Sequence, residues 1–214
     1  MQKSLVDRVP IKSEYFNPNV VLPYGLLLAD VKATLENAHD FVFNLNQMLV
    51  NQLGLRIEDI LMPATFSGML SEFLVRQLSS HSKTLTRNLY HNGHPDLIPV
   101  GRYPGDTVQY GHDGVEVKTS RYASGWQGHN PEKIWIIIFR YSNDPHKPEK
   151  DTRQLEQRLP FQMVEVLMAE LEKGDWSAQG RKSGSRRTPT ASIVASGTVK
   201  LRANWIYRNP AFAV

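Results

Sequence analysis

The chain has 214 residues, of which 41% are hydrophobic and 21% charged, with 25 lysines and arginines against 21 acidic residues and no cysteine. This length and composition are typical of one compact globular domain and argue against wholesale disorder. The absence of cysteine excludes disulfides, thiol catalysis and thiolate zinc sites, so histidine and carboxylate side chains remain as metal ligands.

Hydrophobic runs are short throughout the sequence. The longest, Ile134 to Phe139, has six residues, whereas a membrane-spanning helix needs about 20. Residues 1–10 mix charged and polar side chains without the apolar segment of a secretion signal. We therefore expect a soluble, cytoplasmic protein with no membrane contact.

The positive charge is unevenly distributed. Residues 174–214 carry seven lysines and arginines and a single acid, whereas residues 1–173 carry 18 basic and 20 acidic side chains. Concentrated positive charge is typical of a surface that binds a polyanion. A solvated basic tail is the alternative interpretation.

The N-terminal third is predicted to be helical after an irregular arm. Residues 1–23 contain three prolines, and no proline follows until residue 63. Apolar residues then recur at helical spacing up to about residue 53, which predicts one long or two consecutive amphipathic helices that end at Gly54. Ser67 is a candidate cap for a further helix that carries Glu72 in its first turns.

The middle of the chain has the patterns of β-strands. Residues 94–100 form a short segment flanked by prolines, as at the edge of a sheet. Residues 114–119 alternate between apolar and polar side chains with the period of a strand, which predicts a β-strand. Residues 133–141 are so apolar and β-branched that they predict a central strand buried on both faces.

The C-terminal part is more ambiguous. Residues 151–159 favour a helix, and residues 161–168 favour a strand, although a helix is also compatible. Residues 179–189 have the composition of a surface loop. Residues 190–202 resemble a closing hairpin that turns at Ser196-Gly197.

Together these elements predict a single α/β (α+β) domain. We expect a central mixed β-sheet of four to five strands flanked by helices. Within it we distinguish three parts: an N-terminal arm with helices at 1–60, a core at 65–172 and a basic region at 174–214.

Two short motifs carry the chemical information. Pro95-Asp96 is followed twenty positions later by Glu116-Val117-Lys118. Alternation along a strand places Glu116 and Lys118 on the same face, and carboxylates on neighbouring strands can converge on a divalent cation. Mg²⁺ suits such a site because it takes only one or two protein carboxylates and keeps several waters. The lysine could position or deprotonate water beside a phosphate, or neutralise the developing charge.

This pattern resembles that of the PD-(D/E)XK nuclease superfamily, and the chain is most similar in size and context to a type II restriction endonuclease. The resemblance covers roughly residues 70–140. It implies a restriction-endonuclease-like fold in which Asp96, Glu116 and the main-chain carbonyl of Val117 bind the metal and Lys118 is the catalytic lysine. Glu72 matches a glutamate that several members recruit from the preceding helix. The implied activity is Mg²⁺-dependent, sequence-specific cleavage of double-stranded DNA that leaves 5′-phosphate and 3′-hydroxyl ends.

Other interpretations of these residues stay open. Asp106 and Asp113 are rivals for the first aspartate of the motif. Glu116 and Lys118 could be a solvated pair, and Glu72 could be a surface helix charge. Three loop histidines lack a further ligand at fixed spacing, so they are expected to face solvent rather than to bind zinc: His91, His94 and His112.

Two segments are candidates for DNA contact. The loop at 121–131 follows the catalytic strand directly and carries donors and acceptors for base edges. The basic segment at 181–188 carries arginines, which can read guanine bases, and a lysine, which can contact phosphates. The candidates are Arg121, Trp126, Gln127, His129, Arg181, Lys182, Arg186 and Arg187. Trp126 could instead pack in the core, and the basic segment could contact DNA only nonspecifically.

The nuclease interpretation also implies partners. Cutting both strands of a palindrome requires two catalytic centres related by a two-fold axis, so a homodimer is expected. Residues 26–53 could form its interface or could simply cover the sheet. A restriction enzyme implies a cognate DNA methyltransferase in the host. The alternatives are a DNA repair or recombination nuclease of the same superfamily and a non-catalytic DNA-binding protein.

Overall fold

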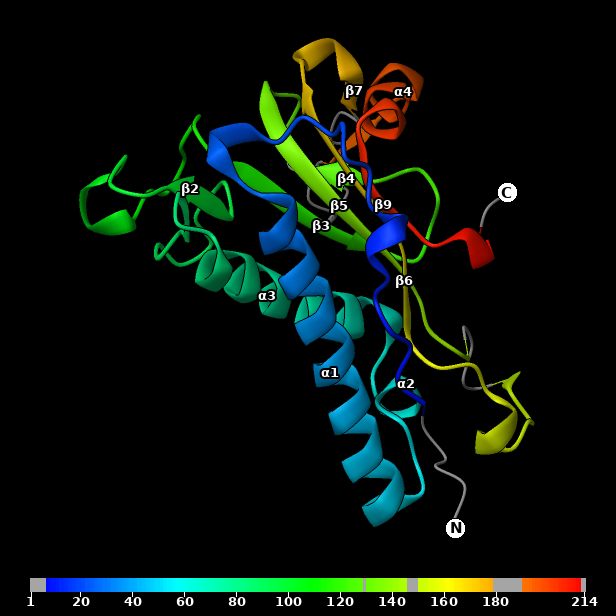
Figure 1. Cartoon of the computed structure of the whole chain (residues 1–214). Helices are drawn as coiled ribbons and strands as arrows, with labels where there is room; N and C mark the ends of the chain where they lie inside the picture. The colour runs from blue at the N-terminus through cyan, green and yellow to red at the C-terminus, as the bar shows by residue number, and fades with distance from the viewer. Residues whose placement is uncertain (1–6, 129, 146–149, 179–189, 213–214) are drawn as a thin grey trace, which may run out of the picture.

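The computed structural model describes residues 7–128, 130–145, 150–178 and 190–212 (Figure 1). Its centre is a six-stranded mixed sheet in the order β1-β2-β3-β5-β6-β9. The strands are β1 (Leu85–Arg87), β2 (Leu97–Pro99), β3 (Val115–Ser120), β5 (Ile134–Ser142), β6 (Gln162–Leu171) and β9 (Trp205–Arg208). Strands β3 and β5 are parallel, and every other neighbouring pair is antiparallel. The predicted mixed α/β architecture is confirmed, but the sheet has six strands instead of four to five.

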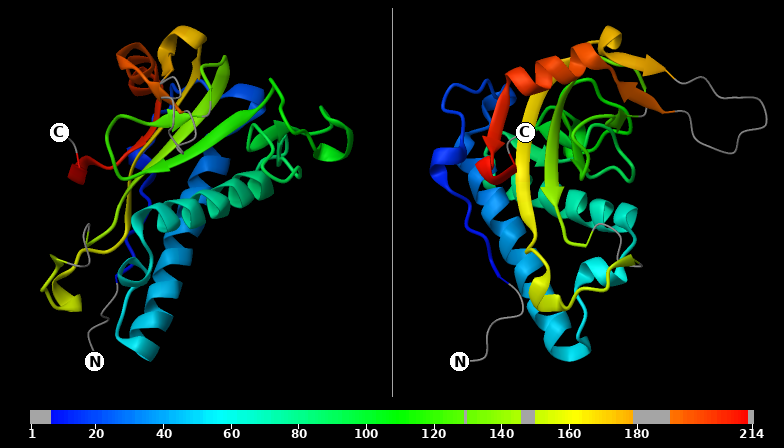
Figure 2. Two further views of the ribbon diagram at one scale, coloured as in Figure 1. Left: turned by 180° about the vertical axis from the view of Figure 1, so that it is seen from behind. Right: turned by 90° about the vertical axis from the view of Figure 1, so that its right-hand side faces the viewer.

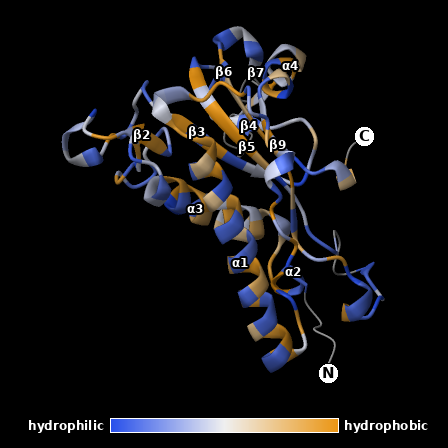
Figure 3. Ribbon diagram, viewed as in Figure 1, coloured by the Kyte–Doolittle hydropathy of each residue, from blue (hydrophilic) through white to orange (hydrophobic). Residues whose placement is uncertain are grey.

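Helices α1 (Leu28–Leu53) and α3 (Pro63–His81) pack on one face of this sheet, with the short α2 (Ile57–Ile60) between them in the chain (Figure 1). Both long helices are amphipathic, and their apolar faces are turned inward (Figure 3). The helical residues fully buried in this core are Val31, Leu35, Ala38, Val42, Phe66, Leu70, Leu74 and Leu78. The apolar stripe of α1 therefore covers the sheet, which was one of the two roles predicted for residues 26–53.

The other face is covered by α4 (Ala195–Ala203) and a second, three-stranded sheet (Figure 2). That sheet has the order β4-β8-β7, formed by Gln127–Gly128, Ala191–Ile193 and Trp176–Ala178. Strand β5 contributes alternate residues to the two cores: Ile137 and Phe139 to one, Ile136 and Ile138 to the other. The prediction of a central strand buried on both faces is thus confirmed.

Several predicted boundaries are also confirmed. Strand β3 matches the alternating segment, and residues 162–171 form a strand and not a helix. Residues 28–53 form one continuous helix, and Gly54 ends it with a φ of 67°, a left-handed conformation that glycine adopts without strain.

Two predictions about helices are wrong. Helix α3 begins at Pro63, which suits the first helical position, so Ser67 lies inside the helix, where its hydroxyl is 2.6 Å from that of Tyr141. Residues 151–159 contain only a short 3₁₀ turn (Leu155–Gln157). There the arginines form ion pairs: Arg158 lies 2.6 Å from Asp59 and 3.2 Å from an oxygen of Asp151.

The predicted hairpin at 190–202 is instead strand β8 followed by helix α4. Gly197 lies inside the helix, and a Cβ there would come within 2.8 Å of the Ile193 side chain and 3.1 Å of Asp175. Glycine therefore serves close packing here and does not mark a turn. Leu201, one helical turn later, is fully buried.

The additional strands of the main sheet are short. Strand β1 has three residues and β9 has four, too few for a periodic pattern to indicate them. Because β1 pairs with β2, residues 97–99 lie inside the sheet and not at its edge. Because β9 pairs with β6, residues from the basic C-terminal region belong to the central sheet. Among the described residues, no helix is long and apolar enough to cross a membrane.

His39 of α1 is a buried histidine outside the predicted site. The main-chain N–H of Met163 donates to Nε2 at 3.0 Å, so the proton of the neutral ring must lie on Nδ1, which is 2.7 Å from the carbonyl oxygen of Val9. Burial lowers the pKa of His39 to about 4, because protonation would place an uncompensated charge in the core and break the bond from Met163.

This pKa shift predicts sensitivity to acid. A histidine pKa that is lower in the folded than in the unfolded protein contributes stability above about pH 6.5, and that stability is lost as the pH falls toward 4. We expect this contribution to be at most about 3 kcal/mol. Glutamine also offers a hydrogen-bond donor and an acceptor but does not titrate. The free energy of unfolding in urea should therefore fall less between pH 7 and pH 4.5 in His39→Gln than in the unsubstituted protein. Equal losses in the two proteins would contradict this assignment.

Candidate active site

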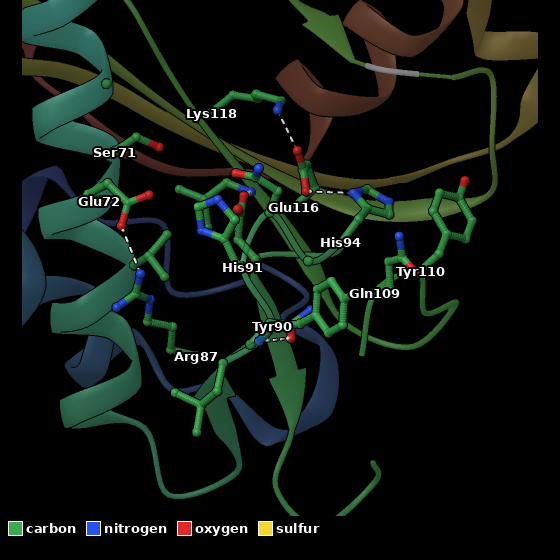
Figure 4. Close-up of a pocket in the computed structure, with 18 of the residues that line it drawn as sticks. Ser71, Glu72, Arg87, Tyr90, His91, His94, Gln109, Tyr110, Glu116 and Lys118 are labelled. Carbon is green, nitrogen blue, oxygen red and sulfur yellow. Dashed lines mark hydrogen bonds and ion pairs between the residues drawn. The ribbon is translucent and has the colours of Figure 1, made fainter. Parts of the chain in front are cut away.

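A cleft of about 1140 Å³ lies between α3, the loop that joins β1 to β2, and β3 (Figure 4). Helix α3 contributes Glu72 and small residues such as Ser71, the loop contributes residues 88–94, and β3 contributes residues 116–119. Asp96, Glu116 and Lys118 all line this cleft. The structure therefore brings both predicted motifs to one place.

The pairing of β2 with β3 explains why the motifs meet. Leu97 pairs with Val115 in an antiparallel register, and the continuation of that register places Asp96 opposite Glu116. An oxygen of the Asp96 carboxylate accepts a 2.8 Å hydrogen bond from the main-chain N–H of Val117. On β3 itself, Lys118 forms an ion pair with Glu116, as the strand alternation predicts.

The two carboxylates differ strongly in their electrostatic environment. Burial would raise the pKa of Glu116, but the hydrogen bond from His94 and the positive charge of Lys118 outweigh it and lower the value to about 2. Burial and the negative charge of Glu116 raise the pKa of Asp96 to about 7. Asp96 and Glu116 therefore repel one another inside a cleft with little solvent screening.

Two residues that were not predicted belong to the surroundings of Glu116: His94 contacts it directly, and Glu132 contacts His94. The ring of His94 is buried, with Nδ1 3.0 Å from Glu116 Oε2 and Nε2 3.2 Å from Glu132 Oε1. Bonding to Glu116 and the negative charges of both glutamates outweigh burial and raise the pKa of His94 to about 9. The expectation that loop histidines face solvent is right for His91 and His112 but wrong for His94.

The remaining predicted carboxylates are placed differently. Glu72 lines the cleft, but its side chain is 68% exposed and pairs with Arg87 at 3.1 Å. Asp106 accepts a bond from the Gly101 N–H, Asp113 pairs with Arg102, and neither lines the cleft. The geometry favours Asp96 over both rivals.

None of the three DNA-contact candidates that the structure describes lines the cleft. Trp126 is 4% exposed and packs in the second core, and its indole N–H donates to the carbonyl of Tyr122. Its prediction as a DNA-contacting residue is therefore corrected. Arg121 lies over the ring of Tyr122, and Gln127 is exposed on β4; neither lines the cleft. The other candidates lie outside the described residues: His129, Arg181, Lys182, Arg186 and Arg187.

Two carboxylates of the cleft, Asp96 and Glu116, are candidate oxygen ligands for a Mg²⁺ ion. Within the part of the chain that the structure describes, no group of three or more histidine or acidic side chains is arranged to hold a metal. Mg²⁺ needs fewer protein ligands, because water and substrate phosphates complete its octahedral coordination. Asp96 and Glu116 would provide two carboxylates, with the Val117 carbonyl as a further ligand. The repulsion that raises the pKa of Asp96 is the environment that a divalent cation stabilises.

The chain was also compared with known proteins. No family model, no curated protein and no solved structure matches it. The geometry of the cleft and the two short motifs are therefore the basis for assigning its function.

Proposed function

We propose that the chain is a Mg²⁺-dependent endonuclease that hydrolyses phosphodiester bonds of double-stranded DNA. The observation that carries this proposal is the hydrogen bond from the Val117 N–H to Asp96, which joins the two motifs next to the ion pair between Lys118 and Glu116. The proposal includes a restriction-endonuclease-like fold, sequence-specific cleavage of the type II class and 5′-phosphate ends, which the motif resemblance implies.

Each residue has a distinct chemical task in this proposal. Asp96 and Glu116 would hold Mg²⁺, which lowers the pKa of a bound water and polarises the phosphoryl oxygen. Lys118 reaches the cleft from the same strand face as Glu116. Its ammonium group can orient the attacking water and stabilise negative charge as it develops on the phosphate. Glu72, on the opposite wall of the cleft, would first have to leave Arg87.

The proposed reaction also implies an oligomeric state and partners for the protein. Cleavage of both strands at a palindrome needs two such clefts, so we include a homodimer and double-stranded DNA in the proposal. A restriction function requires a cognate DNA methyltransferase in the same host.

The test is incubation of the purified protein with long duplex DNA of known sequence, in about 5 to 10 mM Mg²⁺ or in EDTA. We expect discrete fragments only with Mg²⁺, and mapping of their ends gives the recognition site. A smear, or preference for branched or nicked DNA, would indicate a repair or recombination nuclease. Intact DNA in both conditions, together with a gel shift, would indicate a DNA-binding protein without catalysis.

A further inference from the structure

His94 is fixed in place by its own main chain and by a neighbouring ring. Its N–H donates to the Gln109 carbonyl at 3.1 Å, and its carbonyl accepts from the Gly111 N–H at 2.7 Å. The ring of Tyr110 stacks on the imidazole, with centroids 5.1 Å apart and planes inclined by 29°. The imidazole therefore has little freedom to turn away from Glu116 (Figure 4).

Glu132 is held behind the histidine. The hydroxyl of Tyr110 donates to Glu132 Oε2, and the indole N–H of Trp176 donates to the Glu132 main-chain carbonyl at 2.9 Å. The other carboxylate oxygen of Glu132, Oε1, lies 3.2 Å from His94 Nε2, but the two groups are not aligned for a hydrogen bond. The contact between Glu132 and His94 is therefore mainly electrostatic.

Glu116 lies at the end of this chain of contacts. His94 engages Oε2 and Lys118 engages Oε1, so both carboxylate oxygens have a partner on the protein. The residues of this network come from separate segments of the sequence: His94, Tyr110, Glu132, and Glu116 with Lys118 on β3. A metal-binding carboxylate that is held from outside in this way is oriented before the metal arrives.

We propose that His94 is a positioning residue that orients the Glu116 carboxylate for Mg²⁺, and that Glu132 and Tyr110 hold His94 for this task. The inference rests on the proposed function, because it takes Glu116 as a ligand of the metal. It differs from that proposal in assigning a role to three residues outside the recognised motifs.

The test variant is His94→Gln, and the first measurement is its affinity for Mg²⁺ by titration calorimetry without DNA. Partners that orient a metal ligand typically contribute 10- to 100-fold in affinity, so we expect Mg²⁺ to bind about 10-fold or more weakly. The Mg²⁺ concentration for half-maximal cleavage should rise in parallel. Affinity for duplex DNA in EDTA should stay within about twofold, which a general loss of structure would not allow.

Two further variants complete the test. Tyr110→Phe keeps the stacked ring and removes the hydroxyl that bonds Glu132 and Asn130, so Mg²⁺ affinity should fall by a smaller factor than in His94→Gln. This variant carries the test if His94→Gln does not fold. His81→Ala, at the end of α3 and outside the cleft lining, is the matched histidine control and should bind Mg²⁺ as the unsubstituted protein does.

Whether Mg²⁺ affinity falls or rises in His94→Gln decides whether His94 positions Glu116 or acts only as a nearby positive charge. Removal of a cationic side chain beside the carboxylates would by itself strengthen Mg²⁺ binding. If a folded His94→Gln protein binds Mg²⁺ as tightly as the unsubstituted protein, or more tightly, the inference is overturned. The nuclease proposal still stands in that case, provided that the unsubstituted protein cleaves DNA. Mg²⁺ binding without any DNA cleavage would overturn the nuclease proposal, and the affinity ratio would still decide the role of His94. No Mg²⁺ binding by the unsubstituted protein would overturn both.

Discussion

Replacement of Lys118 by alanine is expected to lower the rate of Mg²⁺-dependent DNA cleavage about a thousandfold. Among the described residues that line the cleft, Lys118 is the only lysine, and its ion pair with Glu116 holds the ammonium group beside the carboxylates. Without it, no ammonium group is left to orient the attacking water or to balance charge on the phosphate. Cleavage should be followed in single turnovers with enzyme in excess, so that product release does not mask the chemical step.

The same variant should keep its fold and its metal site. Glu116 retains its contact with His94, so the substitution does not leave a buried carboxylate without a partner. Loss of a cation beside two carboxylates strengthens their electrostatic attraction for Mg²⁺, and His94 still holds the Glu116 carboxylate in place. Mg²⁺ affinity should therefore be maintained or increased, in contrast to the loss expected for His94→Gln.

Lys133→Ala is the matched control for the change in charge. Lys133 is largely exposed, forms ion pairs with Glu170 and Glu172, and does not line the cleft. This variant should cleave DNA at the rate of the unsubstituted protein. A Lys118→Ala protein that also cleaves at that rate would show that the catalytic lysine has been assigned wrongly.

The parts of the fold that could be predicted are those in which a local pattern and the tertiary environment agree. The apolar residues of β5 are buried on both faces, and the valines of β3 pack in the core while Glu116 and Lys118 line the cleft. In α4 the two disagree: Ser196-Gly197 favours a turn, but the close approach of Ile193 and Asp175 requires glycine inside a helix.

The candidate site shows the same limit. Asp96, Glu116 and Lys118 could be found because short motifs on paired strands fix their separation. Glu132 lies 16 residues beyond Glu116 in another segment, and only the fold brings it to His94. The one local signal for His94 was its place directly before Pro95-Asp96. Its burial there depends on the segment around Tyr110, which no sequence period indicates.

Asp96→Asn is expected to abolish cleavage and, without Mg²⁺, to stabilise the fold. The pKa of Asp96 rises from 3.8 to about 7, because burial and the charge of Glu116 oppose ionisation. When the pKa of an acid is higher in the folded than in the unfolded protein, the acid contributes stability below its unfolded pKa of about 4. That contribution is lost as the pH rises to the folded pKa of about 7. Asparagine avoids that loss, and its side-chain oxygen can still accept the bond from the Val117 N–H. The variant should therefore gain about 2 to 4 kcal/mol at pH 8 and nearly nothing at pH 4.

Urea unfolding at these two pH values, with and without Mg²⁺, measures both consequences of the substitution. Mg²⁺ should stabilise the unsubstituted protein, because it binds only the folded site, and should have little effect on Asp96→Asn. Asp106→Asn tests the rival aspartate: it should cleave DNA normally and respond to Mg²⁺ like the unsubstituted protein. An inactive Asp106→Asn together with an active Asp96→Asn would move the metal site away from β2. An Asp96→Asn protein that is inactive, more stable at pH 8 and unresponsive to Mg²⁺ would show that the charge that destabilises this cleft is the charge that binds its metal.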